Sequence, residues 1–118
     1  MNPSLEEALQ SELPLKIEAA EFQDPALLLS GQGWSLSTMC PWRIRRGTHI
    51  EMSWSSPDAA DLVWDLIGLS IVGGSERGLD PAFDLSNGCV IDLFVDNATD
   101  PWILRLADIT LVGPLHGE

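Results

Sequence analysis

Three short blocks of this sequence occur once in its first half and again, in the same order, in its second half. The matched pairs are residues 2–17 and 56–71, residues 24–30 and 80–86, and residues 41–45 and 101–105. The second pair shares Asp-Pro-Ala, and the third shares the rare dipeptide Pro-Trp. Recurrence in a fixed order is typical of a chain made of structural repeats. We therefore predict a single domain over residues 1–118, made of two diverged units at 2–55 and 56–113.

Each unit is predicted to begin with a helix. Asn2 and Ser56 are expected to cap these helices, with a proline at the first helical position. Leucine or valine side chains recur behind them at helical spacing. Pro14 and Gly68 are expected to end the two helices, because proline breaks a helix and glycine readily terminates one.

A β-meander is predicted after each helix, with a turn at the Asp-Pro dipeptide. The expected strands are 15–22, 27–30, 34–39, 42–46 and 48–54 in the first unit, and 69–75, 82–86, 89–95, 102–106 and 109–112 in the second. Asn87-Gly88 predicts a tight hairpin, since this pair readily supplies two positive φ angles. The predicted fold class is α+β: two tandem pseudo-symmetric units, each a helix followed by an antiparallel β-meander, packed as one domain with about eight to ten strands.

The charge of the chain is strongly acidic and uneven. Of 118 residues, 18 are acidic and 6 are basic, which gives a formal net charge of −12. Residues 56–118 hold 11 acidic and 2 basic side chains, whereas residues 1–55 hold 7 and 4. Such a field repels nucleic acids and anionic membranes and favours encounter with a basic protein. We expect no nucleic-acid or membrane partner, and a monomer or homodimer, although solubility alone would also explain the charge.

The N-terminal segment lacks the basic start and apolar run of a signal peptide, and no apolar stretch is long enough to span a membrane. The default expectation is therefore a cytoplasmic protein. Cys40 and Cys89 lie outside any Cys-x-x-Cys or Cys/His motif. We interpret them as reduced, buried thiols, with a disulfide between them as the alternative.

Recognisable catalytic motifs are absent from the sequence. The two histidines, His49 and His116, lie in no nucleophile or metal motif. Asp92, Asp96 and Asp100 are regularly spaced, but a calcium loop needs a glycine and a distal glutamate that this segment lacks. An acidic hairpin tip is the simpler interpretation. We expect no cofactor and no metal site.

Half of the basic side chains follow Trp42 directly, at Arg43, Arg45 and Arg46. In so acidic a chain we expect them to pair with carboxylates of the same chain. A small anion-recognition spot is the alternative.

The five tryptophans differ in how they relate to the two units. Trp42 and Trp102 occupy matching positions, which favours a packing role inside each unit. Trp34, Trp54 and Trp64 have no tryptophan counterpart. We expect these mainly in the core, but an unmatched aromatic is the better candidate for a partner-binding anchor.

Residues 83–106 read FDLSNGCVIDLFVDNATDPWILRL: a strand ending in Ser-Asn-Gly, a second strand, and an acidic loop leading to Pro-Trp. This segment resembles small acidic uncharacterised bacterial proteins, several of which are similar to the immunity proteins that neutralise secreted toxins. The resemblance carries over no catalytic residue and implies a protein-binding role. The first unit departs from it, because Gly31-Gln32-Gly33 stands in place of the Asn-Gly turn.

The sequence thus predicts an acidic protein-binding module, an immunity-type inhibitor of a basic toxin or similar partner, without enzymatic activity. The residues expected to contact the partner are Asp84, Asp92, Asp96, Asp100 and Trp64. One alternative is a structural or homo-oligomeric assembly protein. Another is an unrecognised enzyme with a site between the two units that uses Asp92, Asp96 or His49.

Overall fold

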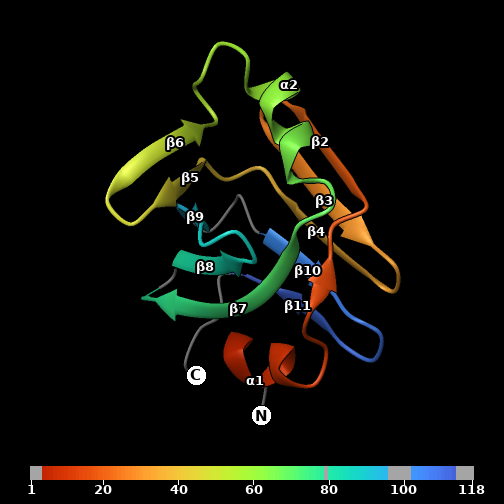
Figure 1. Cartoon of the computed structure of the whole chain (residues 1–118). Helices are drawn as coiled ribbons and strands as arrows, with labels where there is room; N and C mark the ends of the chain where they lie inside the picture. The colour runs from red at the N-terminus through yellow and green to blue at the C-terminus, as the bar shows by residue number, and fades with distance from the viewer. Residues whose placement is uncertain (1–3, 79, 96–101, 114–118) are drawn as a thin grey trace.

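Two antiparallel sheets make up most of the molecule. The computed structural model describes residues 4–78, 80–95 and 102–113. In these residues eleven strands form one sheet of six strands and one of five. Figure 1 shows the six-stranded sheet on the left and below, and the five-stranded sheet on the right and behind.

The order of the strands within each sheet differs from their order along the chain. Across the six-stranded sheet the strands are β1 (Leu15–Lys16), β7 (Ser70–Arg77), β8 (Asp80–Leu85), β9 (Val90–Leu93), β5 (Trp42–Arg46) and β6 (His49–Ser53). Across the five-stranded sheet they are β11 (Thr110–Val112), β10 (Trp102–Arg105), β4 (Trp34–Thr38), β3 (Ala26–Gly31) and β2 (Ala19–Gln23). Each predicted strand therefore has an observed counterpart, and the first strand of the first unit is divided into β1 and β2.

Each sheet combines strands from both halves of the chain. β7, β8 and β9 are continued by β5 and β6, while β2, β3 and β4 are continued by β10 and β11. Trp42 pairs with Leu93 across one junction, and Trp102 pairs with Thr38 across the other. This arrangement is what two similar units would form by exchanging their last two strands. The origin of the halves by duplication stays a prediction.

The predicted α+β class is wrong, because the helices are too short to form a layer. The helix α1 (Leu5–Gln10) has 6 residues, and α2 (Ala59–Leu62) has 4 and continues as the 3₁₀ helix η1 (Val63–Leu66). Segments of one or two turns are marginal without tertiary packing. The fold is therefore mostly antiparallel β-sheet, with two short helices at its borders, and not a pair of helix-led units.

The helix caps differ from the predicted ones. Ser4 caps α1 in a capping box: the amide of Glu7 donates to Ser4 Oγ at 3.2 Å, and the amide of Ser4 donates to Glu7 Oε1 at 3.0 Å. Asn2 lies outside the described residues. The residue at the N-cap of α2 is Asp58, not Ser56, and its side chain makes no capping hydrogen bond. The helix α1 ends at Gln10, ahead of Pro14.

Each helical segment packs against one of the two sheets. The helix α1 packs against β7, and α2 with η1 packs against β2, which Figure 1 shows at the bottom and the top of the molecule. Gly74 of β7 provides room for α1, because a Cβ at this position would lie 2.5 Å from Leu9 Cδ1.

Two turns differ from the sequence-based expectation. Gly88 has a φ of 89°, but Asn87 does not have a positive φ, so the hairpin between β8 and β9 is not the predicted two-residue turn. The amide of Leu85 donates to the carbonyl of Cys89, which closes a three-residue loop. In the second half the chain turns before Asp80, and Pro81 lies inside β8.

One hydrophobic core joins both sheets. Its members come from every part of the described chain and include the fully buried Trp42 and Trp102, as predicted. The ring of Phe22 on β2 meets that of Trp42 on β5 edge-on, with centroids 5.2 Å apart and planes at 88°. Cys40 and Cys89 are both buried and are not joined by a disulfide.

Candidate functional site

Asp92 lies at the centre of a charged cluster on β5 and β9. Arg45 Nε donates to Asp92 Oδ2 at 2.7 Å, and Arg43 Nε donates to the same oxygen at 2.8 Å. The guanidinium of Arg43 also stacks over the Phe94 ring, with Cζ 5.1 Å from its centroid. The prediction that these arginines pair with carboxylates of the same chain is confirmed for Arg43 and Arg45 but not for Arg46. The Arg46 side chain donates to the carbonyl of Asn87 at 2.7 Å.

The cluster changes the acid–base properties of its members. Burial raises the pKa of Asp92, but the hydrogen bonds from Arg45 and Arg43 outweigh burial and hold this pKa below its ordinary value. The hydrogen bond to Asp92 likewise raises the pKa of Arg45. The Asp92 carboxylate is therefore ionised and occupied by two arginines of its own chain. This gives Asp92 a structural role between two strands, and we leave it out of the surface proposed below.

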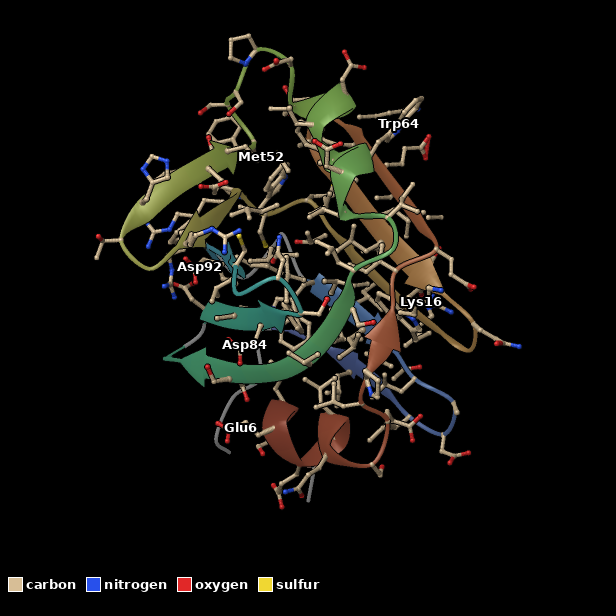
Figure 2. The ribbon with its side chains drawn as sticks, in the orientation of Figure 1. Glu6, Lys16, Met52, Trp64, Asp84 and Asp92 are labelled. Carbon is tan, nitrogen blue, oxygen red and sulfur yellow. The ribbon has the colours of Figure 1, made fainter. Side chains whose placement is uncertain are left out.

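The other predicted aspartates are separated from Trp64. Asp84 is exposed on β8, where its carboxylate lies over Gly73 of β7. Asp96 and Asp100 lie outside the described residues. Figure 2 shows Asp84 and Asp92 on neighbouring strands, with Trp64 at the opposite upper edge of the molecule. The structure therefore does not bring the described candidates into one patch.

Trp64 is the most exposed large apolar side chain among the described residues, at 64%. It lies on η1 and points away from the sheets in Figure 2. Ile67, three residues later, is also exposed, as are the carboxylates of Asp61 and Asp65. We call Asp61, Trp64, Asp65 and Ile67 the Trp64 surface.

The unmatched tryptophans occupy two kinds of environment. Trp34 is buried, and its Nε1 donates to the carbonyl of Lys16 at 3.0 Å. Trp54 and Trp64 are exposed, so the expectation of a core position is wrong for these two.

Of the residues named for an enzymatic site, His49 and Asp92 lie apart, and Asp96 lies outside the described residues. His49 is 76% exposed on β6, and its Nε2 lies 3.6 Å from Glu51 Oε2. Within the described part of the chain, no hydrogen bond or ion pair joins His49 to Asp92. His49 and Asp92 therefore do not form a pair in the described structure.

A groove between β6 and the α2–η1 segment was not anticipated. Its volume is about 160 Å³, and its apolar lining comprises Ile44, Met52, Leu62, Leu66 and Leu69. The exposed carboxylates of Glu51 and Asp65 also line it. We call this feature the β6–η1 groove. In Figure 2 Met52 is labelled near the end of β6.

The groove could not be predicted from the sequence, because its walls come from different halves of the chain. The sequence placed Met52 in a strand and Leu66 in a helix, but no pattern indicated that these elements face each other. That proximity follows from the path of β5 and β6 into the sheet of the second half.

A scan against protein-family models, and searches of curated proteins and of solved structures, found no match for this chain. No helix among the described residues is long and apolar enough to cross a membrane. The described side chains also contain no group of three or more His, Cys, Asp or Glu residues placed to hold a metal ion.

Proposed function

We propose that this chain is a protein-binding module that docks a basic partner on the Trp64 surface, in the manner of an immunity-type inhibitor. The observation that carries the proposal is the exposure of Trp64 beside Ile67 and two carboxylates. Burying an exposed tryptophan against a partner is a common source of binding energy, because its large ring is removed from water.

Charge supports a basic partner. No lysine or arginine occurs between residues 47 and 76, whereas this stretch contains Glu51, Asp58, Asp61, Asp65 and Glu76. All of its aspartates are exposed. A uniformly acidic border around an apolar centre attracts a basic protein and disfavours an acidic one.

The inhibitory role is supported by the sequence resemblance to immunity proteins. An inhibitor needs a complementary surface and no catalytic group of its own. The Trp64 surface meets this requirement with side chains from one short segment.

The test is affinity capture from a native lysate by the immobilised chain, with three forms compared side by side. These are the wild type, Trp64→Ser, and Val112→Ser, which removes another exposed apolar side chain, on β11. We expect the wild type and Val112→Ser to retain the same basic protein and Trp64→Ser to lose it. Truncating an interface tryptophan commonly costs about 2 kcal/mol or more, which is about 30-fold in affinity.

Two results would contradict the proposal. One is equal capture by Trp64→Ser and the wild type. The other is a partner that is itself acidic. Circular dichroism of the three forms checks that Trp64→Ser is folded, as its exposure predicts.

A further inference from the structure

We infer that the β6–η1 groove is a socket for one arginine side chain of the basic partner. The inference rests on the proposed function, because it names the group that this partner would insert beside the Trp64 surface. Asp65 connects the two features: it belongs to the Trp64 surface and also lines the groove.

The size of the groove suits a single side chain better than a small-molecule ligand. Its volume of about 160 Å³ is below the range of roughly 300–1,000 Å³ found for small-molecule and cofactor sites. A single long side chain is an occupant of the right size. The groove is also open to solvent at Glu51 and Asp65, both of which are exposed.

The lining is complementary to both parts of an arginine. Met52 and Leu66 are buried and form an apolar floor against which a flexible aliphatic stem would pack. Glu51 and Asp65 come from opposite walls, β6 and η1, and are exposed above that floor. A guanidinium presents several N–H donors in a rigid fork, so it suits two carboxylates better than an ammonium does.

Two basic side chains, His49 and Arg46, contact residues that line the groove. His49 Nε2 lies 3.6 Å from Glu51 Oε2, so Glu51 is shared with a neighbour on its own strand. The Arg46 guanidinium is held by the carbonyl of Asn87, a residue that also lines the groove. Among the described ion pairs, none involves Asp65.

The experiment uses small probes and does not require the partner. The isotope-labelled chain is titrated with N-acetyl-arginine amide, N-acetyl-lysine amide, N-acetyl-norleucine amide and guanidinium chloride at matched ionic strength, and amide chemical shifts are followed. We expect saturable shifts at Glu51, Met52, Asp65 and Leu66 with the arginine probe. The lysine probe should bind more weakly than the arginine probe. The uncharged norleucine probe, and guanidinium chloride, which has no aliphatic stem, should each bind at least fivefold more weakly than the arginine probe.

Variants locate the binding to the two carboxylates. Glu51→Gln and Asp65→Asn should each weaken the arginine probe by about fivefold, as expected for the loss of one charge contact near the surface. Glu18→Gln is the matched control, since Glu18 is exposed beside a separate cavity of about 260 Å³. It should leave the affinity unchanged.

Three results would overturn the inference: arginine and norleucine probes that bind equally, shifts that map elsewhere, or variants that bind as the wild type does. Each of these leaves capture by the Trp64 surface unaffected. Conversely, if the wild type captures no basic protein but still binds the arginine probe, the proposed function is contradicted and the inference about the groove is not.

Discussion

The carboxylate of Asp92 on β9 and the guanidinium of Arg45 on β5 are joined across the junction between the two halves of the chain, with Nε 2.7 Å from Oδ2. Arg43 contacts the same oxygen at 2.8 Å. The corresponding junction between β4 and β10 pairs Ser37 with Ile103 and carries no such cluster. The β5–β9 junction is therefore ion-paired, whereas the β4–β10 junction has Arg105 opposite Ser35 and no ion pair among the described residues.

Replacing Asp92 by Asn should destabilise the fold by about 1–3 kcal/mol at neutral pH, because two arginines lose a charged acceptor. The folded-state pKa of Asp92 is lowered relative to the unfolded chain. Its stabilising contribution is therefore complete above the unfolded value of about 3.9 and is lost as the pH falls through the folded-state pKa. Urea unfolding of both forms between neutral and strongly acidic pH measures this difference.

The difference in unfolding free energy between wild type and Asp92→Asn should be constant above about pH 5 and shrink below about pH 4. Asp61→Asn, which removes an exposed carboxylate, controls for the change in net charge and should alter stability by less than about 0.5 kcal/mol. A difference that does not change with pH would mean that the Asp92 carboxylate does not stabilise the fold through its charge.

Neighbouring glycines on β7 should respond differently to alanine. A Cβ at Gly74 would lie 2.5 Å from the buried Leu9 Cδ1 and displace α1, so Gly74→Ala should cost about 1–3 kcal/mol. The three atoms nearest to a Cβ at Gly73 would all belong to the side chain of Asp84, which is exposed. Gly73→Ala should therefore cost less, and denaturant unfolding compares the two. Equal costs would argue against the packing of α1 on β7.

The positions of the strands along the chain were predictable from the sequence, whereas their order within the sheets and the fold class were not. The alternation of turn residues and apolar runs placed the strands correctly, because those signals act over a few residues. The helices were overestimated, since leucine spacing alone did not show that α1 ends at Gln10. The exchange of β5 and β10 between sheets depends on contacts distant in sequence, which local patterns do not encode.

The candidate site was predictable only in part. Trp64 was identified because it has no counterpart in the first half, and the structure places it on the surface. Asp92 looked like a free acidic side chain until the structure showed two arginines against it. Glu51 had no distinguishing sequence context, and its place in the groove follows from the position of β6 beside η1.

The two matching tryptophans should tolerate phenylalanine better than Trp34 does. Trp42 Nε1 and Trp102 Nε1 are buried and have no hydrogen-bond partner among the described residues, whereas Trp34 Nε1 donates to the Lys16 carbonyl. Trp102→Phe and Trp34→Phe each leave a void in the core. Trp102→Phe also removes an N–H donor that has no partner among the described residues, whereas Trp34→Phe leaves the Lys16 carbonyl without its donor. Denaturant unfolding should show Trp102→Phe to be less destabilising by about 1 kcal/mol or more. The reverse order would contradict this explanation.

The most direct test of the central claim is the affinity of the captured partner as a function of salt, for the wild type and for Asp61→Asn combined with Asp65→Asn. If a basic protein docks on the acidic Trp64 surface, affinity should fall steeply as salt rises from about 0.05 to 0.5 M, because screening weakens exposed charge pairs. The fall should be shallower for the double variant. An affinity that stays constant over this range, or an identical salt dependence for both forms, would contradict the account.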